Sequence, residues 1–211
     1  MPQKSTTRSY RSTLRAEQAA ATRRRILEAA ATCFIVGGYS GTALSAIAAQ
    51  AGVSLETVKA NGPKRELLLG AFEQAFGGAE SQEPLAEGAQ ATAMLTLPDE
   101  QFLHAAVEFV AGANARTSVL WTEFLSAANA DPAVDEALRD LLVRRRSDYR
   151  TLIHALIERG IARSDLNVER GADALSFICS PESHQQLVLQ SGWSMDRYRE
   201  WLAETIRRQF G

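Results

Sequence analysis

The stretch TALSAIAAQAGVSLETVKANG, from Thr42 to Gly62, has residue types at the spacing that a nucleic-acid-binding helix-turn-helix requires. A helix-turn-helix needs a residue that accepts the left-handed backbone conformation in its turn, and Gly52 stands at that point. Ala48 is small enough for close contact between the two helices. The second helix would present short polar side chains to a DNA major groove. A plain helical hairpin is the alternative for the same pattern. The buried anchors expected in either case are Ile47, Val53 and Val58.

Residues for enzymatic or metal chemistry are not grouped in the same way. The three histidines, His104, His154 and His184, lie far from one another and from a cysteine or paired carboxylate at ligand spacing. Cys33 and Cys179 have neither metal-type nor redox-type spacing. The sequence has no Gly-x-Ser-x-Gly elbow and no glycine-rich phosphate loop. We therefore expect no enzymatic activity, no metal and no cofactor.

Charge is distributed unevenly along the 211 residues, although the formal net charge is only -2. Residues 1–65 hold ten Lys or Arg and three Glu, whereas the rest of the chain is acidic. A basic first third predicts a polyanionic partner for that part of the chain, or else a solvated basic tail. No run of about 18 apolar residues predicts a membrane helix. The basic start has no apolar stretch behind it, which is unlike a secretory signal, so we expect a cytoplasmic protein.

The elements that would position these residues are all helical, because apolar residues recur with a helical period and no stretch alternates like a strand. Residues 1–15 are expected to be a disordered basic tail, and 16–63 a three-helix DNA-binding domain ending in a turn. Residues 64–211 are expected to form a helical bundle for ligand binding and dimerisation. We expect Gly37-Gly38 to end the first helix, Thr42 and Ser54 to cap the next two, and Asp131-Pro132 to begin a long helix ending at Gly160.

The segment Thr22–Phe76 resembles the TetR family of bacterial repressors. The resemblance rests on ILEAAATCFIVGGYSGTALSAIAAQAGVSLETV followed by KRELLLGAF. It implies phosphate contacts from Thr42, Lys59 and Arg65 and base contacts from Ser54, Leu55 and Thr57. Leu55 and Thr57 could each touch a thymine methyl group. Lys59 stands where the family usually has a tyrosine, and Gly62 where it usually has an aromatic residue.

The same resemblance implies an effector site in the second domain. A recognition helix this short contacts only a few base pairs, which predicts a homodimer on operator DNA. We expect the dimer to form through residues 168–190 and 194–209, packed as a four-helix bundle with their partners. We expect two consecutive helices to carry aromatic residues that line a pocket for a small, mostly apolar effector. These candidates are Phe102, Phe109, Trp121 and Phe124.

Two other functions remain open from the sequence. One is a DNA-binding protein of the same fold that responds to no small molecule. The other is a helical scaffold or enzyme whose DNA-binding region has decayed, an idea that Lys59 and Gly62 keep open.

Overall fold

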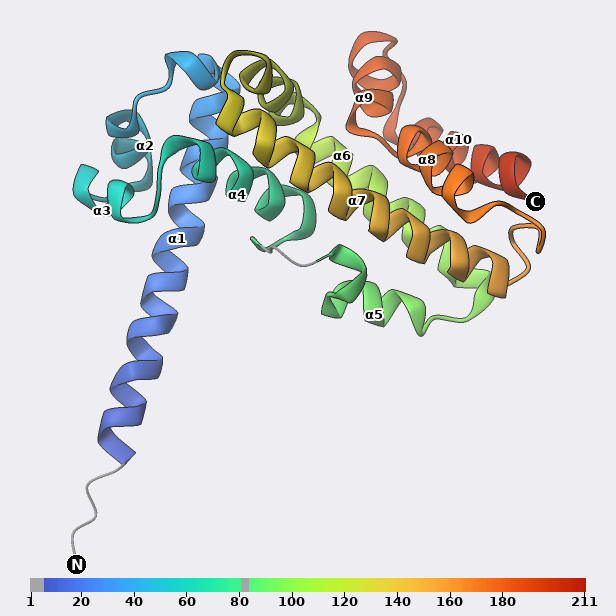
Figure 1. Ribbon diagram of the computed structural model, residues 1–211, viewed down its shortest axis with the longest axis horizontal. Coiled ribbons are helices and arrows are strands. Elements are labelled where there is room, and N and C mark those ends of the chain that lie inside the picture. The colour runs from blue at the N-terminus through green and yellow to red at the C-terminus, as the bar shows by residue number, and fades with distance from the viewer. Residues whose placement is uncertain (1–5, 81–83) are drawn as a thin grey trace, which may run out of the picture.

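The computed structural model describes residues 6–80 and 84–211, and every regular element among them is helical, which confirms the predicted all-α class (Figure 1). The first four helices precede a short linker, and long helices then run side by side toward the C-terminus. The elements in chain order are α1 (Thr6–Gly41), α2 (Leu44–Ala51), α3 (Leu55–Ala60), α4 (Lys64–Gly77), a 3-10 turn (Leu85–Glu87), α5 (Ala89–Leu95), α6 (Asp99–Ala130), α7 (Pro132–Glu158), α8 (Val168–Ile178), α9 (Pro181–His184), a π-helical turn (Gln185–Gln190) and α10 (Met195–Phe210).

The first helix is longer than the sequence pattern indicates. It begins at Thr6, so the expectation of a disordered tail over 1–15 is wrong for residues 6–15, and residues 1–5 lie outside the described part. Residues 14–20 are all exposed, and this end of α1 extends away from the rest of the molecule in Figure 1. At the other end Gly38 has φ 69° and ψ 163°, which breaks the helix at the predicted glycine pair.

A first hydrophobic core joins the N-terminal helices to the body. Phe34 of α1, Ile47 of α2, Val58 of α3 and Leu67 of α4 are all completely buried in it. The same core includes Trp121, near the C-terminal end of α6, and residues at the start of α7. Helices α1 and α4 therefore both pack directly on the body, where each contacts α6.

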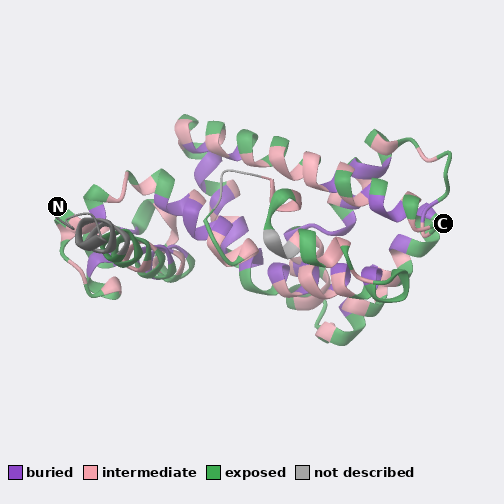
Figure 2. Cartoon of the chain, turned by 90° about the horizontal axis from the view of Figure 1, so that it is seen from below, coloured by how far each residue is buried: buried purple, intermediate pink, exposed green. Residues whose placement is uncertain are grey.

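A second core lies between the other ends of α6 and α7 and the C-terminal helices. Phe102 of α6, Ile153 of α7, Leu175 of α8 and Tyr198 of α10 are buried there. In Figure 2 buried segments run along the long helices, with exposed segments on their outer sides. No helix among the described residues combines the length and apolarity needed to cross a bilayer.

The aromatic candidates lie on one helix, α6, which corrects the expected pair of consecutive helices. The misleading stretch contains Asn114, Thr117 and Ser118, polar residues that favour a loop in isolation. All three are buried, and each side chain makes at least one hydrogen bond, although Asn114 Oδ1 has no partner among the described residues. Asn114 Nδ2 lies 3.0 Å from Tyr198 Oη, and Thr117 donates to the Ala113 carbonyl at 2.8 Å. Tertiary contacts thus keep the helix continuous.

Side-chain caps fix most of the predicted helix starts. Ser54 accepts from the Thr57 N–H, and Asp131 accepts from the Ala133 N–H ahead of Pro132. The expected cap at Thr42 is wrong, since α2 begins after Ala43 and receives no side-chain cap bond.

Candidate nucleic-acid interface and ligand cavity

The turn between α2 and α3 has the geometry of a helix-turn-helix. Gly52 adopts φ 64° and ψ 40°, the left-handed conformation that glycine accepts most readily. Ser54 Oγ then accepts the Thr57 N–H at 3.1 Å and lies 2.8 Å from Thr57 Oγ1. Ile47 and Val58 are completely buried beneath the turn, as predicted. The six-residue α3 is thereby held at the surface of the N-terminal domain.

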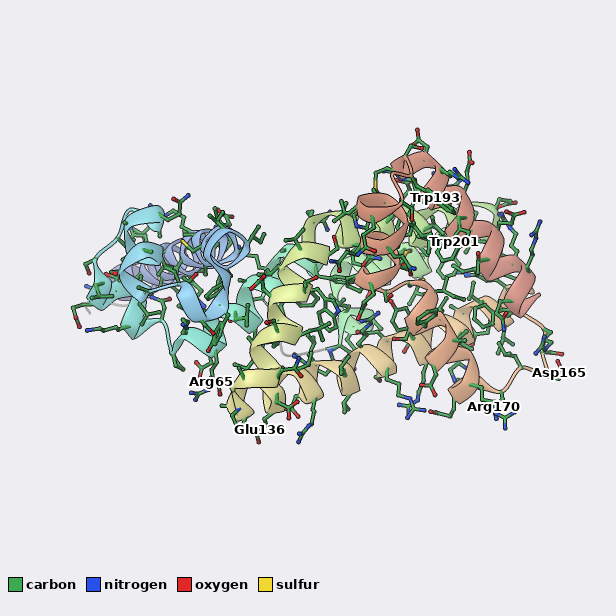
Figure 3. The ribbon with its side chains drawn as sticks, turned by 90° about the horizontal axis from the view of Figure 1, so that it is seen from above. Arg65, Glu136, Asp165, Arg170, Trp193 and Trp201 are labelled. Carbon is green, nitrogen blue, oxygen red and sulfur yellow. The ribbon has the colours of Figure 1, made fainter. Side chains whose placement is uncertain are left out.

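The structure brings most of the predicted DNA-contact residues to that surface. Ser54, Lys59 and Arg65 are exposed, while Leu55 and Thr57 are half-buried. Lys59 Nζ lies 2.9 Å from Glu56 Oε1, an ion pair between largely exposed groups that a phosphate could displace. Arg65 points outward from the beginning of α4 in Figure 3.

Thr42 stands apart from this group because its side chain is buried. Its hydroxyl lies 2.7 Å from the Gly38 carbonyl and 3.0 Å from the Cys33 carbonyl. In this structure Thr42 closes the turn after α1, and a phosphate contact from its hydroxyl would require these bonds to break.

Two cations outside the predicted set of DNA contacts fix the N-terminal domain internally. Lys64, the first residue of α4, donates to the carbonyls of Tyr39 at 2.8 Å and Thr42 at 3.1 Å. Arg23 of α1 donates to Glu80 at 2.6 and 2.8 Å and also to the backbone carbonyl of Asn61, the C-terminal cap of α3. Their partners lie 22 to 57 positions away, so no local pattern marks them.

A cavity of about 550 Å³ lies among α4, the segment that follows it, α6 and α7. Its volume falls in the range of small-molecule sites. Phe109 and Trp121 line it, as the sequence predicts. Phe102 and Phe124 do not, because they are buried in the second and first cores respectively. The other apolar wall residues include Phe72, Phe76, Leu85, Met94, Leu95 and Leu152.

Charged side chains also line this cavity. Arg144 and Glu73 form an ion pair at 2.6 Å, and Asp148 accepts the Ala86 N–H at 2.8 Å. Burial raises the pKa of the Asp148 carboxyl. The Arg145 guanidinium lies over two aromatic rings, 5.7 Å from the centroid of Trp121 and 5.6 Å from that of Tyr149. These groups were not predicted, because a run of three arginines on α7 is equally typical of a solvated face.

Titratable groups elsewhere are dispersed. Cys33 packs against the first core and Cys179 lies in the second, and burial raises the pKa of Cys179 to about 12. His184 is buried beside Ser118, whereas His104 and His154 are exposed. No group of His, Cys, Asp and Glu that could hold a metal occurs among the described residues.

An exposed apolar surface lies within the segment expected to dimerise. Phe177 of α8 is 78% exposed and Leu189 of the π-helical turn is 52% exposed. The exposed positions of α10 are mostly charged, by contrast, including Asp196, Glu200 and Arg207. The apolar part of the expected interface is therefore concentrated in residues 168–190.

Comparison with family models shows that residues 26–58 match the model for bacterial regulatory proteins of the tetR family. This match covers the helix-turn-helix described above, from the buried end of α1 to Val58 of α3. A comparison with curated proteins finds no match.

Solved structures share the fold over most of the chain. A candidate transcriptional regulator from Saccharomonospora viridis, in complex with choline, is 23% identical with a TM-score of 0.67, covering 89% of this chain and 96% of that one. A candidate TetR-family regulator from Rhodococcus sp. is 18% identical with a TM-score of 0.71, covering 90% and 100%. FadR from Bacillus subtilis, in complex with stearoyl-CoA, is 14% identical with a TM-score of 0.67, covering 89% and 99%.

Proposed function

We propose that this chain, whose residues 26–58 match the model for tetR-family regulatory proteins, acts as a homodimeric transcription repressor that a small, mostly apolar effector releases from its operator. The observation that carries the DNA-binding part is the α2–α3 geometry, with Gly52 in the left-handed turn and an α3 whose outer residues are exposed. Such a regulator would act in the cytoplasm, where bacterial DNA lies.

In this proposal α3 enters the major groove with its N-terminal residues toward the bases. Ser54, Leu55 and Thr57 make the base contacts, and Lys59 and Arg65 contact phosphates on either side. The basic balance of residues 1–65 supports this orientation, since the rest of the chain would repel the phosphate backbone.

Dimerisation follows from the size of the recognition helix. Six residues contact only a few base pairs, so two copies related by a twofold axis are needed to read an operator. We propose that residues 168–190 and 194–209 form the interface, with the exposed Phe177 and Leu189 near its centre.

The cavity between α4, α6 and α7 is the proposed effector site. Solved regulators of this fold hold choline and stearoyl-CoA, and the apolar walls of this cavity support a ligand with a substantial apolar part. Phe72 and Phe76 of α4 line the cavity, while Lys64 at the start of α4 binds the turn before α2. A ligand that moves α4 would therefore change the position of the DNA-binding helices.

A gel-retardation assay on the DNA upstream of the chain's own gene tests the proposal. We expect a retarded complex that competing non-specific DNA does not abolish. The variant Val58→Asp, which replaces the buried anchor of α3, should remove the complex. The control variant Glu136→Gln, which changes an exposed residue of α7, should not. Failure of the wild-type chain to retard this DNA, or any selected DNA, would contradict the proposal.

A further inference from the structure

Among the described residues, each carboxylate that lines the cavity has a donor. Glu73 pairs with Arg144 at 2.6 Å, and Glu80 pairs with Arg23 at 2.6 Å from outside the cavity. Asp148 accepts the Ala86 N–H. A ligand would therefore not have to supply a partner for any of these three acidic groups.

Arg145 differs from its neighbours in this respect. Its Nη2 donates to the Ser176 carbonyl at 2.8 Å, and its guanidinium lies against the rings of Trp121 and Tyr149. Arg144 and Arg146 each pair with an acid, but no carboxylate lies within ion-pair distance of Arg145 among the side chains that the structure describes. A partly buried guanidinium whose contacts are all neutral is unusual, because removing a charge from water is costly without a counter-ion.

A second donor on the same wall, the indole of Trp121, has no acceptor at all among the described residues. Trp121 is 2% exposed, and its indole Nε1 is buried with no hydrogen-bond partner among the described residues. The wall formed by Arg145 and Trp121 thus has donors in excess, while the remaining walls are mainly apolar.

We propose that the cavity binds an amphipathic organic anion, with its carboxylate on the Arg145 guanidinium and its hydrocarbon part along Phe76, Leu95 and Phe109. This proposal rests on the effector site proposed above and specifies its ligand class. A planar guanidinium binds a carboxylate through two parallel hydrogen bonds, and the Trp121 and Tyr149 rings lie against that of Arg145. The anion would supply the counter-ion that Arg145 lacks.

Three probes of equal chain length separate the head groups: decanoate, decanol and decyltrimethylammonium, titrated calorimetrically into the full-length protein below their aggregation concentrations. We expect decanoate to bind at least about tenfold more tightly than the other two, the lower end for a charge-assisted hydrogen bond. Arg145→Met should remove this preference and leave decanol affinity unchanged. Arg146→Met is the matched control, since Arg146 pairs with Glu169 and Asp173 and does not line the cavity.

Each other outcome overturns a defined part of the account. Equal binding of decanol and decanoate, or retention of the preference in Arg145→Met, would contradict the anion proposal and leave the apolar effector site intact. Preference for decyltrimethylammonium would show a cation site instead. Binding of none of the three probes, with operator binding intact, would contradict both the ligand class and the effector site.

A separate set of contacts joins the cavity to the recognition helix. Arg23 holds the Glu80 carboxylate with two of its nitrogens and donates from the third to the Asn61 carbonyl, at the end of α3. Glu80 itself lines the cavity. Its carboxylate lies over Gly70 of α4, where a Cβ would be only 2.5 Å from Glu80 Oε1. One guanidinium therefore connects a cavity wall with the cap of α3.

We infer that Arg23 is a positioning residue, which keeps α3 in its DNA-binding orientation only while Glu80 is in place. This inference also rests on the proposed function and gives it a route other than movement of α4. An effector that displaces Glu80 would release the Arg23 guanidinium, and the end of α3 would lose its anchor. Because both partners are only partly buried, the contact can open without unfolding the domain.

The direction in which one substitution changes DNA affinity distinguishes this positioning role from a general effect of net charge. Removing an acidic group should strengthen DNA binding if only net charge matters. We expect Glu80→Gln to weaken operator binding several-fold, and Gly70→Ala to do the same by displacing the Glu80 carboxylate. Glu87→Gln, an exposed carboxylate of the same linker, is the control and should not weaken binding.

Operator affinity is measured by fluorescence anisotropy on a selected duplex. The double variant Arg23→Gln with Glu80→Gln should lose no more operator affinity than Arg23→Gln alone, since both substitutions remove the same Arg23–Glu80 contact. Unchanged or stronger binding by Glu80→Gln, or additive losses in the double variant, would contradict the positioning role. Loss of DNA binding by the wild-type chain would instead contradict the proposed function.

Discussion

Lys59 and Thr57 occupy neighbouring positions on α3, yet the account gives them different roles. The proposal assigns Lys59 to phosphate, which carries no sequence information, and Thr57 to the bases. Lys59→Ala should weaken binding to all duplexes alike and reduce the salt dependence, d log K against d log salt, by about one. Thr57→Ala should change which bases are preferred. Anisotropy titrations at several salt concentrations measure both effects.

The opposite pattern would contradict these roles. If Lys59→Ala changed the preferred bases while the salt dependence stayed constant, Lys59 would be the base-contacting residue. Glu56→Ala is a useful control, since it removes the internal partner of Lys59 and should not reduce the salt dependence.

His184 gives the stability of the fold a dependence on pH. Burial lowers the pKa of its ring, which lies beside Ser118 Oγ and the Tyr198 ring, so the folded state favours the neutral form. The unfolded chain then binds more protons below the ordinary histidine pKa of 6.5. The contribution of His184 to stability is complete above that pH and is lost as pH falls below it.

Urea unfolding at pH 5 and at pH 7.5 checks this expectation, because these pH values lie about one unit or more below and above the ordinary histidine pKa of 6.5. The loss of stability toward pH 5 should be smaller in His184→Gln than in the wild-type chain. His154→Gln, which changes an exposed histidine, should keep the wild-type dependence. Equal pH dependence in all three chains would show that His184 titrates as it does in the unfolded state.

At the residue scale, sequence reasoning identified residues whose role depends on local geometry. Gly52 and Ser54 follow from the turn they make, and Ile47 and Val58 from helical periodicity. Arg23 and Arg145 could not be distinguished from other arginines, because their partners come from distant parts of the chain.

The α2–α3 turn depends on one glycine more than on any helical residue near it. Gly52 has a left-handed backbone and open space where a Cβ would lie, so Gly52→Ala adds strain without a clash. We expect it to lower the free energy of unfolding by about 1 kcal/mol. Gly41→Ala is the control, since Gly41 also has open space but not a left-handed backbone. Chemical denaturation followed by circular dichroism measures the difference.

If Gly41→Ala were the more destabilising change, the turn would owe its shape to packing rather than to backbone conformation. A pair of equally neutral substitutions would lead to the same conclusion.

Helix boundaries were predictable where a cap or breaker is local, as at Ser54 and Asp131. They were not predictable where tertiary contacts satisfy polar groups, as at Asn114 in α6. This single difference changed the expected pocket, because Phe102 and Phe124 lie on one continuous helix and do not face each other from two helices. Phe109 and Trp121, between them, line the cavity.

At the scale of the whole molecule, the fold class followed from helical periodicity, whereas the cavity did not. Its wall residues come from α4 and the segment after it, from α6 and α7, and from Pro181 of α9, which approach one another only after folding. The dimer is a further whole-molecule prediction, since a surface such as that around Phe177 is exposed in a single chain.

Phe177→Asp should weaken dimerisation, because a carboxylate would be buried in the proposed interface without a partner. Light scattering at micromolar concentration should give the mass of two chains for the wild type and a smaller mass for the variant. Val36→Asp, which alters a residue 83% exposed at the other end of the molecule, should remain dimeric. A wild-type monomer at this concentration would contradict the proposed assembly.

The most direct measurement for the account as a whole is selection of bound duplexes from a random double-stranded DNA library by the full-length protein. The account predicts an inverted repeat whose half-sites lie about one helical turn or more apart, because two copies of α3 must bind on one twofold axis. A selection that enriches no sequence, or enriches a single unrepeated half-site, would contradict the claim that this chain is a dimeric, sequence-reading regulator.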